Sequence, residues 1–248
     1  MTRISVLLLL APLSLSTACA TAHGKPPATT QHEPGRATTH HSFADVERWS
    51  AIFDDPARDE WQKPEAVVAA LDIKHGHTVA DLGAGTGYFV PYLARAVGAE
   101  GTVYAVDVEP GMVGHLRKRA EESGHDQVIP VLASLDRPRL PTGRVELVLI
   151  VDTFHHLDHR ADYLTKLAAT LTPLGRVAII DWRKQPLPEG PPPEHKLARS
   201  QVVDEMAGAG FVLIESPDIL PFQYFLIFRK SDGTTSGARA AGTGRRGD

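Results

Sequence analysis

A short apolar run that leads directly into three glycines constrains the fold of this 248-residue chain more than any other feature. Residues 78–82 read TVADL, and Gly83, Gly85 and Gly87 follow at alternate positions before a helical stretch at residues 88–97. Glycine adopts the left-handed backbone conformations that a tight turn needs. The pattern therefore predicts a buried strand, a turn and a helix, whose first N–H groups favour an anionic ligand.

Strand and helix patterns continue to alternate along the chain. The expected strands cover residues 78–82, 102–106, 128–132, 145–151, 176–182, 211–215 and 222–228, and the expected helices cover residues 65–71, 88–97, 110–123, 160–171 and 201–209. Repeated βα units with right-handed crossovers predict an α/β fold with a doubly wound, seven-stranded, Rossmann-like sheet that is mostly parallel. Residues 216–221 are too few for a parallel crossover, so we expect an antiparallel last strand.

The first residues of the chain have the composition of a leader rather than of a folded domain. Residues 1–20 contain a basic start, a short apolar run and then small residues, which is typical of a secretory signal peptide. Cys19, the only cysteine, resembles the lipidated cysteine of a bacterial lipoprotein signal, although Ser16 stands where Leu is usual. Ordinary cleavage after Ala20 or Ala22 is the alternative. We expect an exported protein, periplasmic or anchored to a membrane through lipidated Cys19.

Composition also divides the rest of the chain. Residues 21–42, rich in Thr, Pro, His and Gly, are expected to form a flexible linker, and residues 231–248 a disordered tail. Residues 43–230 then form one domain. The net charge of -4 and the lack of a basic stripe argue against a nucleic-acid partner, which needs clustered Lys and Arg. One cysteine allows no intramolecular disulfide.

Two acidic residues restrict the ligand of the glycine turn. The G-x-G-x-G spacing places the third glycine one residue earlier than in the dinucleotide motif G-x-G-x-x-G. Asp81 stands two positions before the first glycine, and Asp107 follows the next predicted strand. A carboxylate at the second place can accept hydrogen bonds from ribose hydroxyls. These residues point to a nucleoside-containing cofactor.

The segment VADLGAGTGYF (79–89) resembles motif I of class I S-adenosylmethionine-dependent methyltransferases of type 11/25, and YAVDVEPGMV (104–113) resembles their second-strand motif. The likeness covers about residues 60–228 and includes VELVLIVDTFHHL (145–157), LTPLGRVAIIDW (171–182) and the antiparallel last strand. It implies methyl transfer from S-adenosylmethionine to a small-molecule acceptor. It leaves the acceptor atom (O, N, C or S) and the oligomeric state open.

Two alternatives to this enzyme stay open. An exported, noncatalytic module that binds or senses S-adenosylmethionine is one, because the cofactor is made in the cytoplasm. A nicotinamide-dependent Rossmann oxidoreductase is the other. The chain lacks the glycine spacing of such oxidoreductases, and no catalytic Tyr-x-x-x-Lys is evident.

The resemblance implies a cofactor-binding set. Its members are Asp81, Gly83, Gly85, Gly87, Asp107, Val108, Glu109, Ser134 and Asp152. The glycines would line the methionine portion, Asp81 would hold its ammonium, and Asp107 would bind the ribose, with the next two residues flanking ribose and adenine. Ser134 or Asp136 would contact the adenine amino group. Asp152 would face the methyl-transfer centre or the cofactor ammonium.

The residues that would contact the methyl acceptor are less clearly defined by the sequence. His155 or His156 is a candidate general base, since histidine titrates near neutrality. The alternative role is to shape the pocket or to cap the next helix. A metal site built from these two and His159 is disfavoured, because no matching acidic or cysteine ligands are suitably spaced.

Further residues are expected around the acceptor because of their place in the fold. Asp181 and Trp182 end the fifth strand and should border the pocket. In the resembled family the segment before motif I, here residues 43–75, commonly forms a helical lid. Arg58, Trp61 and Gln62 could then contact the site, and simple packing on the sheet is the alternative. The Pro-rich stretch after the fifth strand predicts acceptor contacts near His195.

Overall fold

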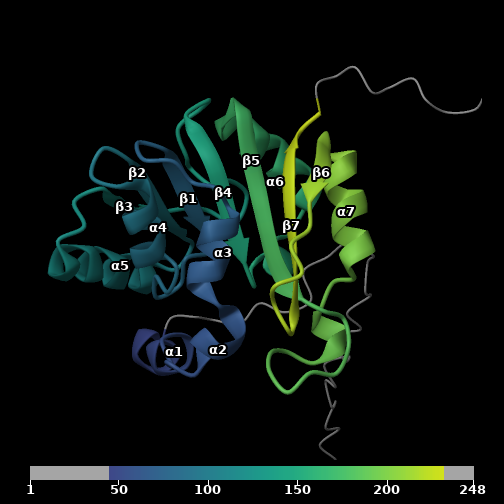
Figure 1. Ribbon diagram of the computed structural model, residues 1–248, viewed down its shortest axis with the longest axis horizontal. Coiled ribbons are helices and arrows are strands. Elements are labelled where there is room, and N and C mark those ends of the chain that lie inside the picture. The colour runs from purple at the N-terminus through teal and green to yellow at the C-terminus, as the bar shows by residue number, and fades with distance from the viewer. Residues whose placement is uncertain (1–44, 232–248) are drawn as a thin grey trace, which may run out of the picture. The chain divides into compact units, whose positions relative to one another are not determined.

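Seven strands form one sheet in the computed structural model, which describes residues 45–231 (Figure 1). The strands are β1 (Thr78–Leu82), β2 (Thr102–Asp107), β3 (Val128–Leu132), β4 (Val145–Val151), β5 (Leu171–Trp182), β6 (Phe211–Glu215) and β7 (Gln223–Lys230). Their order is β3-β2-β1-β4-β5-β7-β6. The first five are parallel, whereas β7 is antiparallel to both β5 and β6. This confirms the predicted fold class, including the antiparallel last strand.

Helices cover both faces of this sheet (Figure 1). The α-helices are α1 (Val46–Phe53), α2 (Arg58–Gln62), α3 (Pro64–Ala70), α4 (Val90–Val97), α5 (Pro110–Ser123), α6 (Arg160–Thr170) and α7 (Arg199–Gly208), with short 3-10 turns η1 (Phe154–His156) and η2 (Pro193–His195). Side chains of α3, α4 and α5 belong to one apolar cluster, and those of α6 and α7 belong to another. None of the helices within residues 45–231 is long and apolar enough to cross a membrane.

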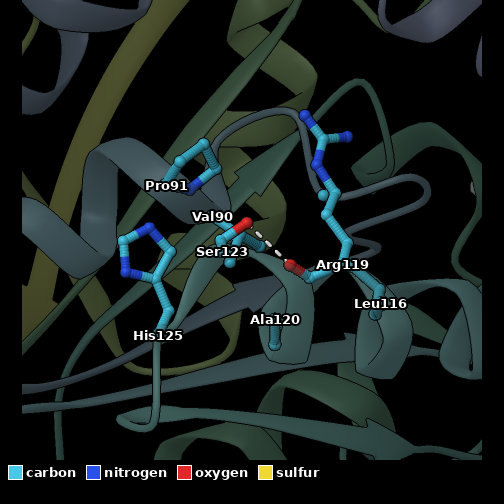
Figure 2. Close-up of a pocket in the computed structure, with 8 residues that line it drawn as sticks. Val90, Pro91, Leu116, Arg119, Ala120, Ser123 and His125 are labelled. Atoms are coloured by element: carbon cyan, nitrogen blue, oxygen red, sulfur yellow. Dashed lines mark hydrogen bonds between the residues drawn. The ribbon is translucent and has the colours of Figure 1, made fainter.

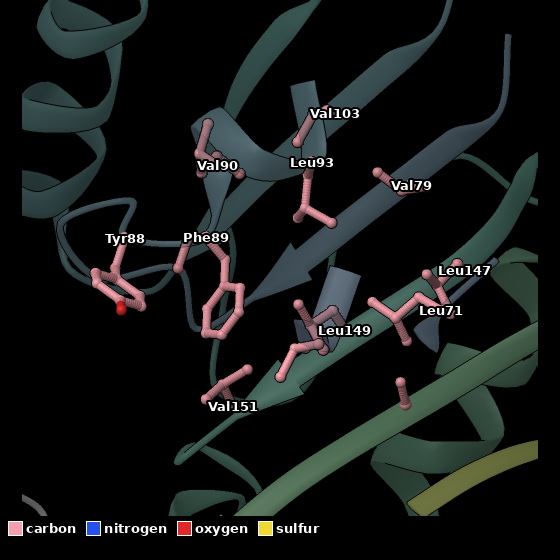
Figure 3. Packing of buried hydrophobic residues seen from close by; sticks show 14 of the residues in the cluster. Leu71, Val79, Tyr88, Phe89, Val90, Leu93, Val103, Leu147, Leu149 and Val151 are labelled. Carbon is pink, nitrogen blue, oxygen red and sulfur yellow. The ribbon is translucent and has the colours of Figure 1, made fainter. Parts of the chain in front are cut away.

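Strand β4 shows why its sequence is almost entirely apolar. Leu147, Leu149 and Val151 pack in the cluster with α3 and α4, and Figure 3 shows them in one group with Leu71, the residue after α3. Val148 and Ile150 point to the opposite face and pack in the cluster with α6 and α7. Successive strand side chains alternate between faces, so a central parallel strand needs apolar residues at every position.

Most predicted boundaries lie within two residues of those observed, but β5 differs. It begins at Leu171, not at residue 176, because Leu171 already pairs with Val145. The next pair along the ladder is Leu147 with Arg176, so the intervening residues bulge out of the strand. Leu174, within this bulge, is 90% exposed. The gap expected between the helix at residues 160–171 and the strand at residues 176–182 is therefore a bulge inside a longer strand.

Three predictions fall at the ends of the chain. The leader at residues 1–20 with Cys19, the linker at residues 21–42 and all but the first residue of the tail at residues 231–248 lie outside the described residues. Within the described part, α1, α2 and the loop after β5 gather at one edge of the sheet, at the bottom of Figure 1. The parallel strands carry their carboxyl ends there, which is where ligands bind in such sheets.

Candidate functional site

A cavity of about 730 Å³ opens at the carboxyl ends of β1, β2 and β4. Pockets for small organic ligands span about 300–1,000 Å³, so this volume suits a cofactor together with a small second ligand. A second hollow between α4 and α5 measures only about 20 Å³ (Figure 2). That space holds about one water molecule. The larger cavity is therefore the candidate site.

The glycine turn after β1 forms one wall of the cavity. Gly83 and Gly85 line it, with φ angles of 77° and 55°, in the region that favours glycine. The N–H groups of Gly83 and Ala84 donate hydrogen bonds to the carbonyl oxygen of Val106 at 2.8 and 2.9 Å, which ties the turn to β2. A Cβ at Gly83 would stand 2.3 Å from Oγ1 of Thr153. Glycine thus permits close contact between this turn and the end of β4.

Asp107 joins the turn to the end of β2. Its Oδ2 accepts a hydrogen bond from the N–H of Gly85 at 2.8 Å, and its Oδ1 accepts one from the N–H of Glu109 at 2.9 Å. A carboxylate oxygen can accept two hydrogen bonds, so each oxygen keeps capacity for one more. Burial raises the pKa of Asp107, while these backbone donors oppose the rise. The half-buried carboxylate lines the cavity, ready to accept a pair of hydroxyl donors.

Asp81, at the end of β1, is almost completely buried and lines the same cavity. Burial raises the pKa of Asp81 to about 7, with a smaller rise from Asp107 and an opposing effect of Arg58. Among the described residues, none donates a hydrogen bond to its carboxyl group. A buried carboxyl without a donor is costly. Such a group suits a cationic ligand.

Arg58 of α2 lines the cavity and contributes a guanidinium group to its wall. It donates hydrogen bonds to the carbonyl oxygen of Phe53 at 3.1 Å and to Oε1 of Gln62 at 3.2 Å. Its guanidinium carbon lies 4.2 Å from the ring centre of Tyr88, and one terminal nitrogen lies 3.9 Å from Asp152. The α2 segment therefore brings a positive charge over the glycine turn.

Two buried amides connect α2 to the sheet. Gln62 donates a hydrogen bond to Oε1 of Gln223 at 3.0 Å, and Gln223 donates one to Oδ1 of Asp152 at 2.7 Å. Asp152, just after β4, has a φ of 51°, which is uncommon for a residue other than glycine. Burial, together with the nearby Asp181 carboxylate, raises the pKa of Asp152 to about 7. The amide chain fixes the direction of this carboxyl group.

His155 of η1 and Asp181 at the end of β5 form a buried pair. Nδ1 of His155 lies 2.9 Å from both carboxylate oxygens of Asp181. Burial by itself lowers the pKa of His155, but Asp181 and, to a lesser extent, Asp152 outweigh it, so the pKa lies above its ordinary value. His155 lines the cavity, whereas Asp181 is fully buried behind it.

Comparisons with known proteins point in one direction. Residues 79–175 match the family described as Methyltransferase domain. A SAM dependent methyltransferase from Aquifex aeolicus shares the fold with a TM-score of 0.71 and 29% identity, over 76% of this chain and 98% of that one.

Two curated relatives match a shorter stretch. Aklanonic acid methyltransferase DauC from Streptomyces sp. (strain C5) is 30% identical over 104 residues, which are 42% of this chain and 47% of that protein. The ubiquinone/menaquinone biosynthesis C-methyltransferase UbiE of Cupriavidus necator is 26% identical over 118 residues, 47% of this chain and 48% of that protein. The chain thus spans about half the length of the curated relatives it matches.

Residues 79–175 form a methyltransferase domain. The Aquifex aeolicus protein that shares the fold is a SAM dependent methyltransferase, which uses S-adenosylmethionine as its methyl donor. The sheet extends beyond the matched residues. Strand β7, which lies antiparallel between β5 and β6, ends at Lys230.

The cavity of the methyltransferase domain fits this cofactor by charge. S-adenosylmethionine carries a sulfonium, an ammonium, a carboxylate and two ribose hydroxyls. Asp81 offers a buried carboxyl group without a donor, Asp107 keeps free acceptor capacity, and Arg58 supplies the positive charge. The turn at Gly85 leaves room beside them, since a Cβ there would meet nothing nearer than Phe53 at 3.5 Å.

The structure brings most of the predicted cofactor-binding residues to the cavity wall. These are Asp81, Gly83, Gly85, Asp107, Val108, Ser134 and Asp152. The Ser134 hydroxyl donates a hydrogen bond to Asp136, which also pairs with Lys166 on the outer side. These two partners lower the pKa of Asp136 to about 2. Between the two alternatives for the adenine contact, the structure therefore favours Ser134.

Gly87 and Glu109 are the two predicted cofactor-binding residues that do not line the cavity. A Cβ at Gly87 would stand 2.7 Å from Leu116, so this glycine lets α5 pack against the turn. Glu109 is the residue before the first turn of α5, and its N–H donates to Asp107. Both positions support the cavity from behind.

On the acceptor side the structure places most of the expected residues in the wall. His155, His156, Arg58, Trp61, Trp182 and His195 line the cavity. The rings of His155 and His156 are 4.1 Å apart, and those of Trp61 and Trp182 are 5.2 Å apart. Gln62 and Asp181 are buried behind the wall and reach it only through other residues. Within residues 45–231 no cluster of His, Cys, Asp or Glu is arranged to hold a metal ion.

Sequence reasoning missed the contacts that hold α1 and α2 over the glycine turn. Tyr88 donates a hydrogen bond to Asp59, while Asp54 accepts hydrogen bonds from Thr86 at 2.9 Å and from Arg119 at 3.0 Å. It also missed Gln223, whose available signal was a single amide at the start of an apolar strand. A buried polar residue in such a place requires a polar partner.

Proposed function

We propose that this protein transfers a methyl group from S-adenosylmethionine to a small-molecule acceptor. The observation that carries the proposal is the convergence of Asp81, Gly83, Gly85 and Asp107 on one cavity that also holds polar groups beyond the cofactor residues. The names of the matched proteins, which include a ubiquinone/menaquinone C-methyltransferase and an aklanonic acid methyltransferase, support a small organic acceptor.

Three charged residues of the cavity would each bind a different group of the cofactor. Asp107 would hold the ribose, Asp81 would pair with the ammonium, and Arg58 would pair with the carboxylate of the cofactor. When bound, S-adenosylmethionine supplies an electrophilic methyl group on a positively charged sulfur. Holding the acceptor against that methyl group would account for much of the rate gain, because the two reactants no longer have to meet and align in solution.

The α1 and α2 segments would exclude water from this reaction. Trp49, Phe53 and Trp61 line the cavity from these helices. Arg58 and Gln62 connect α2 to the end of β4 and to β7. A site closed in this way strengthens the charge interactions inside it.

Release of S-adenosylhomocysteine by the purified full-length chain tests the proposal. We expect release to depend on an added acceptor and to fall when Asp107 is changed to alanine. A panel of hydroxylated aromatic compounds, enolisable ketones, amines and thiols covers the acceptor atoms. Tight cofactor binding without turnover of any member would favour the second candidate, a noncatalytic module that binds or senses S-adenosylmethionine.

The leader sequence is the observation that favours the second candidate. We propose export because residues 1–20 have the pattern of a signal peptide, and lipidation because Cys19 follows its apolar run. An exported enzyme needs a supply of a cofactor that is made in the cytoplasm. The shared fold does not fix the reaction either: the [4+2]-cyclase SpnF has it, with a TM-score of 0.59 at 14% identity.

Mass spectrometry of the mature N-terminus tests export. An acylated Cys19 as the first residue is the expected result. A start after Ala20 or Ala22 would support export without lipidation, and an intact Met1 in the cellular fraction would contradict both.

A further inference from the structure

The part of the cavity beyond Asp81 and Asp107 carries its own set of groups. Trp61 and Trp182 give it flat apolar walls, and His155 and Asp152 are among its polar groups. We propose that this part takes an uncharged, planar acceptor with an acidic O–H group, phenolic or enolic, and that His155, oriented by Asp181, removes its proton. This rests on the proposed methyl transfer and narrows its acceptor.

The His155 ring is oriented for proton removal. Asp181 lies 2.9 Å from Nδ1 and also accepts hydrogen bonds from the N–H groups of His155, at 3.3 Å, and Trp182, at 2.8 Å. With Nδ1–H donating to the carboxylate, the neutral ring carries its lone pair on Nε2. Among the described residues, Nε2 has no hydrogen-bond partner, and the residue lines the cavity. Nε2 can therefore accept a proton from a bound ligand.

The charge of the wall disfavours an anionic acceptor. Six lining residues carry carboxyl groups: Asp55, Asp81, Asp107, Asp152, Asp158 and Glu189. Arg58 is the single lining Lys or Arg within the described residues, and it lies 3.9 Å from one of these carboxylates. The sulfonium and ammonium of the cofactor suit such a wall. A carboxylate or phosphate on the acceptor would meet repulsion and find no free cation.

The shape of this part favours a flat ring. The Trp61 and Trp182 rings meet at 41°, and the face of Trp182 also meets Gly190, where a Cβ would stand 2.6 Å from the indole. Gly190 has a φ of 84° and brings the loop after β5 directly against this ring. Trp182 is buried in this way and supports Trp61, the half-buried ring that lines the cavity and offers a surface for stacking an aromatic or conjugated acceptor.

The reaction balances without a further reactant. The acceptor O–H bond breaks, and its proton goes to Nε2 of His155, whose new charge is offset by Asp181. The electron pair left on oxygen forms the bond to the methyl carbon. The methyl–sulfur bond breaks as that bond forms, and its electron pair returns to sulfur, which becomes neutral.

Acceptor pairs test the charge part of the inference on the full-length chain. Each pair consists of a neutral phenol and the same phenol with an added carboxylate, with S-adenosylhomocysteine release as the readout. We expect kcat/KM to be at least about tenfold higher for the neutral members. A preference for the carboxylated members would overturn the inference, as would turnover of none of the neutral members by a chain that binds S-adenosylmethionine. Failure to bind the cofactor would instead contradict the proposed function.

Variants test the proton-accepting pair. His155→Gln should lower kcat roughly 10²–10⁴-fold, the usual contribution of a general base, with a smaller change in KM. His75→Gln is the matched control, because this exposed histidine precedes β1 at the opposite edge of the sheet. Unfolding curves confirm that each variant folds. An unchanged kcat for His155→Gln on a neutral acceptor would overturn the role of His155.

Nuclear magnetic resonance titration of the His155 ring gives a readout that does not need turnover. The charged and titratable groups that face this ring are Asp181, Asp152, Arg160 and His156. We expect the ring to titrate above its ordinary pKa in the native chain and at lower pH in Asp181→Asn. The acidic limb of kcat against pH should move in the same direction. A titration that Asp181→Asn leaves in place would show that Asp181 does not orient or charge-balance this histidine.

Discussion

The two halves of the cavity are encoded in different ways. The central part of the cofactor half comes from one continuous stretch, in which Asp81 and Asp107 lie at the ends of two neighbouring strands and the glycine turn lies between them. The acceptor half joins segments that are far apart: Gln62 and Gln223 are separated by 161 positions, and His155 and Asp181 by 26. A local stretch produces a recognisable motif, whereas distant contacts leave only isolated residues in the sequence.

Gly83→Ala should have the largest effect and should act on the cofactor half. A positive φ costs a non-glycine residue about 1–3 kcal/mol, and the clash with Thr153 adds about 1–3 kcal/mol of overpacking. Gly76→Ala is the control, because Gly76 has a φ of 83° but no atom near its Cβ position. Urea unfolding of both variants separates the two costs. Equal losses of unfolding free energy would show that Thr153 yields without cost.

Gln223→Leu should test the acceptor half. It removes a buried amide, so that the Gln62 side-chain nitrogen loses its acceptor and Asp152 loses its amide donor, which costs about 1–3 kcal/mol of unfolding free energy. Gln62→Leu should cost a similar amount, and the double variant should cost less than the sum, since both ends of one hydrogen bond are then removed. Strictly additive losses in this cycle would mean that the two amides do not act as a pair.

Asp107→Ala should weaken binding of S-adenosylmethionine by about 1–3 kcal/mol, because charged hydrogen bonds to the ribose hydroxyls are lost. It also removes the acceptor for the N–H groups of Gly85 and Glu109, so unfolding free energy has to be measured alongside. Asp107→Asn, which keeps an acceptor oxygen, should lose less affinity. If both variants bind like the native chain, the ribose is held elsewhere.

The pH dependence of cofactor binding should show the smallest effect. Burial raises the pKa of Asp81 to about 7, so its carboxyl group becomes neutral below that pH and no longer balances the ammonium. Affinity should fall by up to about tenfold for each pH unit below 7. Asp81→Asn should bind more weakly above pH 7 and respond less to pH. A pH profile that this variant leaves unchanged would assign the titration to another group.

The same raised pKa has a consequence for the free protein. Between pH 3.8 and about 7 the folded chain holds a proton on Asp81 that the unfolded chain releases. The contribution of this group to stability therefore falls as pH rises through that window. Cofactor binding, which favours the charged carboxyl group, should reduce this loss.

The sequence allowed the strands, the mostly parallel sheet with its antiparallel last strand and the glycine turn to be predicted, because the strands are short apolar runs and the turn is local. The contact of Gly83 with Thr153 and the position of Gly87 against α5 were not predictable, since they depend on how helices pack on the finished sheet. Nothing in the sequence around Asp181 indicated which residue it pairs with. Its pairing with His155 arises only because β4 and β5 are neighbours, which places η1 beside the end of β5.

Calorimetric titration of the full-length chain with S-adenosylmethionine at pH 8 tests the central claim most directly. At this pH Asp81 is charged, and one cofactor should bind per chain. The competitor S-adenosylhomocysteine should displace it, and NADH should not. Absence of binding by the folded chain, or equal binding of NADH, would contradict the assignment of this cavity to S-adenosylmethionine.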